Sequence, residues 1–216
     1  GAEALRRTTV AGEAAAAPDG ASGSIVELDA LSAREVPRRV AVFGGAWTGP
    51  DEEEHAHAVA LGRRLAGSGI QVVSGGYQGI MDAVSVGAAE EGGVAVGVTI
   101  ATWADRSTPS SALTHEARAR DLFARLPLIC DAEAWIAFSG GAGTLAEVAL
   151  CWNLLQADPE PNRPLVVVGD RWGRAIGNLR EHLVVVEQAD WDLIRTARDA
   201  EQAAGQVAAA LEGSTR

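Results

Sequence analysis

Short, continuous apolar runs alternate with amphipathic segments along most of this chain. The runs lack the apolar–polar alternation of strands that face water on one side, so they predict strands buried on both faces. We expect strands at 40–43, 71–73, 94–100, 134–138, 164–168 and 193–196. Helical patterns predict helices at 51–65, 80–91, 117–129, 144–156, 172–182 and 200–211. This alternation is typical of an α/β protein, and we predict a Rossmann-like, doubly wound parallel sheet with helices on both faces.

The first part of the chain differs in composition from the rest. Residues 1–36 are rich in Ala, Gly and Ser and show no sustained periodicity. We expect them to form an arm that is flexible or packs on a partner subunit. Residues 37–216 are numerous enough for one hydrophobic core and are predicted to form a single Rossmann-like domain.

Charge and composition exclude several kinds of partner and chemistry. A formal net charge of −11 argues against binding to long nucleic acids or to anionic membrane surfaces. All 18 basic residues are Arg, which excludes a Walker A loop and any Schiff-base or pyridoxal-phosphate chemistry, because each requires a lysine. Cys130 and Cys151 lie in apolar stretches without metal-ligand spacing, so we expect reduced core thiols in a cytoplasmic protein, with no metal and no cofactor.

Pairs of glycines follow three of the predicted strands. They are Gly44-Gly45, Gly75-Gly76 and Gly140-Gly141. Ligands of parallel sheets bind at the carboxyl ends of the strands, and glycine lets a ligand approach the backbone closely. We therefore expect the three pairs to line one binding crevice.

The third Gly-rich turn gives the strongest chemical signal. Gly140, Gly141, Gly143 and Thr144 follow a strand and open a helix, an arrangement that presents backbone N–H groups to an anion. We predict that a phosphate group binds there. Glu147 lies one helical turn further on, where a carboxylate is suited to a hydroxyl or to a developing positive charge rather than to the phosphate.

The second turn has the same strand, turn and helix order. Gly79 stands near the helix start, where the backbone can approach a ligand, and Met81 follows it. Asp82, one turn into the helix, is a candidate for binding a sugar hydroxyl. A different interpretation of the third turn, Gly141-x-Gly143-x-x-Ala146, is the dinucleotide fingerprint of nicotinamide-dependent enzymes. That pattern here follows the fourth predicted strand and lacks the acidic residue expected about 20 positions later.

Both turns resemble motifs of the LONELY GUY family. The motif Pro-Gly-Gly-x-Gly-Thr-x-x-Glu corresponds to Ser139–Glu147, and Gly-Gly-x-x-Gly-x-Met corresponds to Gly75–Met81. The resemblance spans about residues 40–168. It implies a dimeric Rossmann-like phosphoribohydrolase that cleaves adenosine monophosphate, or its N6-prenylated cytokinin forms, to the base and ribose 5-phosphate. Ligands on this basis are nucleoside monophosphates, and Glu147 would stabilise the oxocarbenium-like ribose.

The chain departs from that family at three places. Ser139 replaces the motif's Pro, and the first Gly loop lacks a Ser that is often present there. The family's Arg before the fourth strand has three candidates, Arg118, Arg120 and Arg125; we assign Arg125 as catalytic by spacing and Arg120 as ligand-binding. The departures leave open a related protein that binds nucleotides or a pterin cofactor and carries it without hydrolysis.

The helix predicted at 144–156 is apolar on more than one face. Packing against the sheet covers one face only, so an apolar strip remains. We therefore expect a homodimer built partly on this helix.

Overall fold

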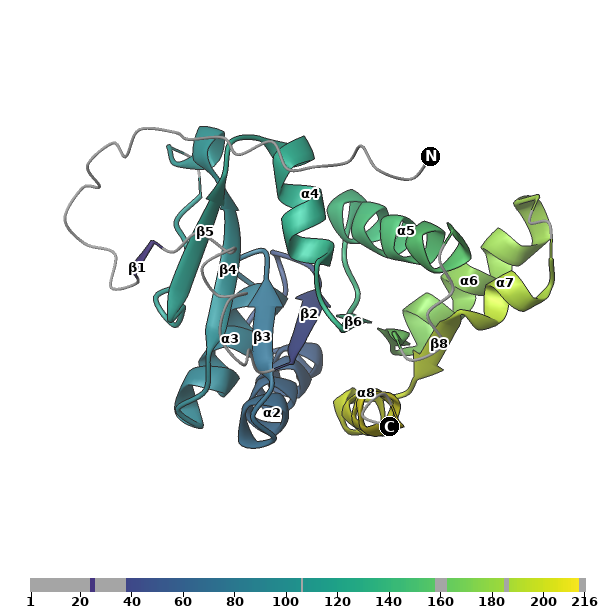
Figure 1. The fold of residues 1–216 in the computed structure, drawn as a ribbon, viewed down its shortest axis with the longest axis horizontal. Coiled ribbons are helices and arrows are strands. Elements are labelled where there is room, and N and C mark those ends of the chain that lie inside the picture. The colour runs from purple at the N-terminus through teal and green to yellow at the C-terminus, as the bar shows by residue number, and fades with distance from the viewer. Residues whose placement is uncertain (1–23, 26–37, 106, 158–162, 185–186, 214–216) are drawn as a thin grey trace, which may run out of the picture.

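The computed structural model describes residues 24–25, 38–105, 107–157, 163–184 and 187–213, and these form one parallel sheet flanked by helices (Figure 1). The sheet has eight strands in the order β1-β5-β4-β3-β2-β6-β7-β8, and every neighbouring pair is parallel. The strands are β1 (Ser24–Ile25), β2 (Arg39–Phe43), β3 (Gln71–Ser74), β4 (Ala95–Ile100), β5 (His115–Ala119), β6 (Ala134–Ala137), β7 (Leu165–Val168) and β8 (Ile194–Ala197).

Helices cover both faces of the sheet. One face packs against α2 (Glu53–Gly67), α3 (Ile80–Glu90) and α8 (Ala200–Gly213). The other face packs against α4 (Leu122–Cys130), α5 (Ala142–Ala157), α6 (Asp170–His182) and the short α7 (Ala189–Asp192). A 3-10 turn, η1 (Ala101–Trp103), follows β4. The predicted doubly wound α/β fold is therefore confirmed.

Burial on both faces explains the continuous apolar runs. Along β2, Val40 and Val42 pack into the core on the α2 and α3 side, while Ala41 and Phe43 pack on the opposite side. All five residues of the strand are buried. Such a strand has no solvent-facing positions at which polar residues would be favoured.

Chain order changes direction at β2. The chain passes from β2 outward through β3, β4 and β5, and then returns to place β6 on the other side of β2. Such a reversal separates the loops that leave neighbouring strands and opens a crevice at their carboxyl ends. The carboxyl ends of β2, β3 and β6 are therefore where the fold favours a ligand.

The helix predicted at 117–129 is wrong in its first part. Residues 115–119 form β5, which pairs with β4 on one side and with β1 on the other. α4 begins only after Asp121, whose carboxylate accepts a hydrogen bond of 2.8 Å from the N–H of Ala124, and it continues through Pro127. The strand carries His115, Glu116 and Arg118, so its sequence lacks the apolar run that marked the central strands.

Part of the predicted arm takes part in the sheet. Ser24 and Ile25 pair with His115 and Glu116 of β5. The other residues of the 1–36 segment lie outside the described residues. Within the described part of the chain, no helix is both long enough and apolar enough to cross a membrane.

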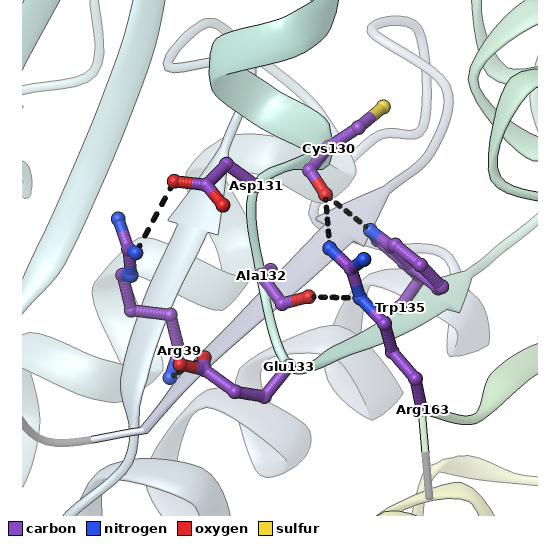
Figure 2. Close-up of polar contacts among 7 residues, drawn as sticks. All are labelled: Arg39, Cys130, Asp131, Ala132, Glu133, Trp135 and Arg163. Atoms are coloured by element: carbon purple, nitrogen blue, oxygen red, sulfur yellow. Dashed lines mark hydrogen bonds and ion pairs between the residues drawn. The ribbon is translucent and has the colours of Figure 1, made fainter. Parts of the chain in front are cut away.

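The amino end of the sheet is held by two arginines (Figure 2). The Arg163 guanidinium lies 4.3 Å from the Trp135 ring centroid and donates a 3.2 Å hydrogen bond to the Cys130 carbonyl. Trp135 Nε1 donates to the same carbonyl at 3.0 Å. At the start of β2, the Arg39 N–H donates to the Glu133 carboxylate at 2.7 Å. These contacts fix the connection between α4 and β6. They therefore also fix the carboxyl end of α4, the helix that contains Arg125.

Candidate functional site

The three Gly-rich turns meet at the backbone N–H and carbonyl groups of Gly45. Its N–H donates a 2.9 Å hydrogen bond to the Ser139 carbonyl, which leads into the third turn. Its carbonyl accepts a 3.0 Å hydrogen bond from the N–H of Ile80, at the start of α3. The turns after β2, β3 and β6 therefore form one connected surface at the carboxyl end of the sheet.

Close contact explains why Gly79 is a glycine. Its φ of +70° lies in the region that glycine adopts readily, and a Cβ there would lie 2.2 Å from the Gly45 carbonyl oxygen. A side chain at this position would push the second turn away from the first. The close approach at Gly79 is therefore one between two parts of the backbone, the second turn and the first.

The third turn lies at the start of α5. The helix begins at Ala142, so Gly143 and Thr144 belong to its first turn. Gly140, Gly141 and Gly143 are exposed, whereas Thr144 is buried, and a Cβ on Gly140 would lie 2.1 Å from the Thr144 hydroxyl oxygen. The N–H groups in the first turn of a helix have no acceptor within that helix and carry its positive dipole end. This turn is therefore an accessible place for an anion.

Neighbouring elements hold the residues that lead into this turn. The buried Trp172 of α6 donates from Nε1 to the Phe138 carbonyl at 2.9 Å. The Ser139 N–H donates to Oε1 of Glu54, in the first turn of α2, at 2.9 Å. The backbone before Gly140 is thus fixed from both faces of the sheet.

Arg125 and Glu147 form a buried ion pair beside the turns. Nη1 of Arg125 lies 3.1 Å from Oε1 of Glu147, and both side chains are more than nine-tenths buried. Nε of Arg125 donates to the Val98 carbonyl at 2.7 Å, which fixes the guanidinium from the β4 side. A Cβ on Gly75 would lie 2.2 Å from Nη2 of Arg125. The guanidinium therefore lies against the second turn and links it to α5.

Burial and charge have opposite effects on Glu147. Burial raises the pKa of its carboxyl group, and the nearby Arg125 lowers that pKa through its charge and hydrogen bond, with burial the larger effect. A carboxyl group with a raised pKa in a crevice is typical of functional sites.

The other predicted ligand residues occupy less central positions. Met81 packs with its sulfur against Gly75, and Asp82 accepts a hydrogen bond from the Ser110 hydroxyl. Arg120 is exposed and donates to Asp121 at 2.8 Å, at the start of α4. Gly44 and Gly76 belong to the first and second turns, next to the central contacts. Of the three arginine candidates, Arg125 is the one that the fold places beside Glu147.

Arg118 lies elsewhere, in β5. It donates to the buried carboxylate of Glu116 at 3.1 Å, and Glu116 also accepts from the Thr99 hydroxyl. This cluster satisfies its own charges within the sheet. Among the described residues, no group of three or more His, Cys, Asp or Glu side chains is arranged to hold a metal ion.

Two residues that touch the site carried no signal in the sequence. Glu54 is one of several consecutive acidic residues at the start of α2, a pattern that suits the helix dipole without any further role. Trp172 looks like an ordinary core residue of α6. Glu54 and Trp172 lie 85 and 34 residues away in sequence from the residues that they contact, so sequence spacing could not predict these contacts.

Comparison with known proteins agrees with this geometry. The model of the SLOG cluster4 family matches residues 37–157. A cytokinin riboside 5′-monophosphate phosphoribohydrolase from Rhodococcoides fascians is 32% identical over 161 residues, which cover 71% of this chain and 79% of that protein.

Similar solved structures cover about four-fifths of the chain. The molybdenum cofactor binding protein from Rippkaea orientalis has a TM-score of 0.66 at 20% identity, covering 82% of this chain and 99% of that one. The molybdenum cofactor carrier protein from Chlamydomonas reinhardtii has a TM-score of 0.59 at 25% identity, covering 81% and 99%. The family model and the relative from Rhodococcoides fascians show that the chain belongs to the SLOG cluster4 family of LONELY GUY-like, Rossmann-fold proteins.

Proposed function

We propose that this protein is a nucleoside 5′-monophosphate phosphoribohydrolase. The observation that carries the proposal is the buried Arg125–Glu147 ion pair, 3.1 Å long, beside the exposed glycines that open α5. An anion site next to a carboxylate fits a substrate that has a phosphate at one end and develops positive charge a few bonds away. Adenosine monophosphate and its N6-prenylated cytokinin forms have this distribution of charge.

The turn at 140–144 binds the 5′-phosphate through its backbone N–H groups in this proposal. The N-glycosidic bond breaks with its electrons moving to the base, which takes up a proton. Water adds to the ribose carbon and gives up a proton, which balances the proton taken up by the base, so the products are free base and ribose 5-phosphate. Glu147 stabilises the oxocarbenium-like ribose, because a fixed opposite charge acts strongly in a site that excludes water.

Arg125 has two roles in this proposal. Its charge opposes the effect of burial and favours the ionised form of the Glu147 carboxylate, and its fixed guanidinium orients that carboxylate. Its other nitrogen, Nη2, lies against Gly75 and so borders the space in which we place the nucleotide. Ribose hydroxyls and the purine would then contact the turns that contain Gly44 and Gly76, together with Asp82 of α3.

A carrier of a nucleotide or pterin cofactor is the second candidate. The fold match to a molybdenum cofactor binding protein and to a molybdenum cofactor carrier protein favours it, because those chains are covered almost completely. The existing pairing of Glu147 with Arg125 is also compatible with a role confined to binding. In that case the turns bind the ligand's phosphate and no bond is broken.

Product analysis distinguishes the two candidates. The protein is incubated with adenosine monophosphate, and adenine and ribose 5-phosphate are quantified by chromatography. A hydrolase releases the two products in equal amounts over many turnovers. Nucleotide binding without adenine release would favour the carrier, and the same assay with prenylated substrates identifies the preferred base.

We also infer a reducing, cytoplasmic location. Cys130 and Cys151 are buried free thiols whose sulfur atoms lie 3.6 Å apart. A disulfide would require about 2.05 Å. Two neighbouring thiols that remain reduced are usual in cytosolic proteins.

A further inference from the structure

The acidic first turn of α2 contacts the turn to which we assign the phosphate. Oε1 of the half-buried Glu54 accepts the hydrogen bond from the Ser139 N–H at 2.9 Å, across 85 residues of sequence. A carboxylate close to a bound phosphate is electrostatically unfavourable. If Glu54 favours phosphate binding, it must do so through an effect that outweighs this electrostatic repulsion.

Glu54 has such an effect, because its hydrogen bond helps to orient the two peptide groups of Ser139. Ser139 accepts from the Gly45 N–H through its carbonyl and donates to Glu54 through its own N–H. The residue before it, Phe138, is bonded through its carbonyl to Trp172. Gly140 and Gly141 follow directly, and glycines impose few conformational limits of their own. The direction of the N–H groups in the turn thus depends on how firmly Ser139 is held.

We propose that Glu54 is a positioning residue that fixes the 140–144 turn in its phosphate-binding conformation. The proposal rests on the proposed function in that the anion is the 5′-phosphate of the nucleotide. Glu54 has two opposing effects on affinity. Its acceptor oxygen orders the turn and favours binding, whereas its negative charge repels the phosphate.

Two conservative variants separate these effects. Glu54→Gln keeps an acceptor oxygen at the same reach and removes the charge. Glu54→Asp keeps the charge but is shorter by one methylene, so it withdraws the acceptor from Ser139. Glu53→Gln and Glu53→Asp are matched controls, because Glu53 is the neighbouring residue of the same turn and its side chain is 88% exposed.

Affinity for adenosine monophosphate and for ribose 5-phosphate is measured by titration calorimetry at low salt. We expect Glu54→Asp to bind both ligands about tenfold more weakly, since hydrogen bonds to charged groups have effects of this size. We expect Glu54→Gln to bind as tightly as the wild type or up to about threefold more tightly, and the Glu53 variants to change affinity less than twofold. Amide hydrogen exchange at Ser139 should quicken in Glu54→Asp and not in the Glu53 variants.

Other outcomes overturn the proposal. Equal affinity in the two Glu54 variants, or weaker binding by Gln than by Asp, would show that the acceptor geometry has no role. An unchanged rate of amide hydrogen exchange at Ser139 in Glu54→Asp would also overturn the proposal, and this measurement requires no ligand. Tight phosphate-dependent binding with no adenine release would reject the hydrolase and leave the role of Glu54 intact, whereas a wild type that binds neither ligand would reject both.

Discussion

At the scale of single residues, the fold buries the Glu147 carboxylate and holds it in a fixed position beside Arg125. Burial opposes its ionised form, and Arg125 favours that form at a distance of 3.1 Å. Arg125 is itself held by the Val98 carbonyl, so the pair cannot easily rotate apart. A carboxylate prepared in this way interacts strongly with a cation that develops close to it.

The raised pKa of Glu147 has a consequence for stability that does not depend on any substrate. The folded protein holds this proton more tightly than the unfolded chain, whose carboxyl has its ordinary pKa of 4.5. Between 4.5 and the raised value the folded state binds more protons, so the free energy of unfolding falls as pH rises.

Urea unfolding of the wild type and of Glu147→Gln across this pH range tests that consequence. The wild type should lose stability relative to the variant as pH rises from 4.5, because the variant has no proton to release there. A difference that is constant with pH, or that grows in favour of the wild type, would contradict the raised pKa.

Cys130 and Cys151 should be inert in the folded protein. Burial raises the pKa of the Cys151 thiol, and both side chains lie in the core on the face of the sheet that α4 and α5 cover. Because the thiolate is the reactive form, Ellman's reagent should label neither cysteine in the native state and both in denaturant. Rapid labelling of native protein would show that α4 and α5 separate in solution.

At the scale of elements, the site depends on backbone contacts between turns rather than on side chains alone. Gly79→Ala tests this dependence, because it adds a Cβ 2.2 Å from the Gly45 carbonyl at a φ of +70°. We expect a loss of at least about 3 kcal/mol in the free energy of unfolding, from strain plus displacement of the turn.

Gly92→Ala is the matched control for that variant. Gly92 has a φ of +66°, and a Cβ there would meet nothing within 4 Å. This variant should therefore lose only about 1 kcal/mol, from backbone strain alone. Equal losses in the two variants, measured by chemical denaturation, would contradict the role of contact between the turns.

Some strands and site contacts can be predicted from the sequence and others cannot. The central strands are apolar on both faces, so their runs are plain in the sequence. β5 is not predicted, because Glu116 and Arg118 satisfy one another inside the fold, which no local pattern reveals. Spacing favours Arg125 among the three candidate arginines, and the packing of α4 beside α5 places its guanidinium next to Glu147, a contact that spacing alone does not predict. The contact between Glu54 and Ser139 depends on the complete sheet.

At the scale of the whole molecule, α4 and α5 expose apolar side chains on one side of the protein. Figure 1 shows the two helices next to one another above the sheet. Their exposed apolar residues are Leu122, Phe123, Leu145 and Leu154. A second copy of the chain would cover such a surface by a symmetric contact.

Light scattering tests this assembly at micromolar concentration. We expect the wild type to be a dimer and Leu145→Glu to shift it toward monomer, because a charge would be buried within the contact. Leu183→Glu is the control, since Leu183 is equally exposed, 48% in each case, but follows α6. A monomeric wild type, or equal effects of the two substitutions, would contradict a dimer built on α4 and α5.

The most direct test of the proposed reaction compares the wild type with Glu147→Gln. Adenine release from adenosine monophosphate and affinity for the nucleotide are measured side by side. Gln keeps the shape of the side chain and removes the charge that offsets the oxocarbenium ion, so turnover should fall about 10²–10³-fold. Affinity should change far less, because the bound substrate carries no such cation. Equal turnover in the two proteins, or no adenine release by the wild type, would contradict the proposed role of Glu147.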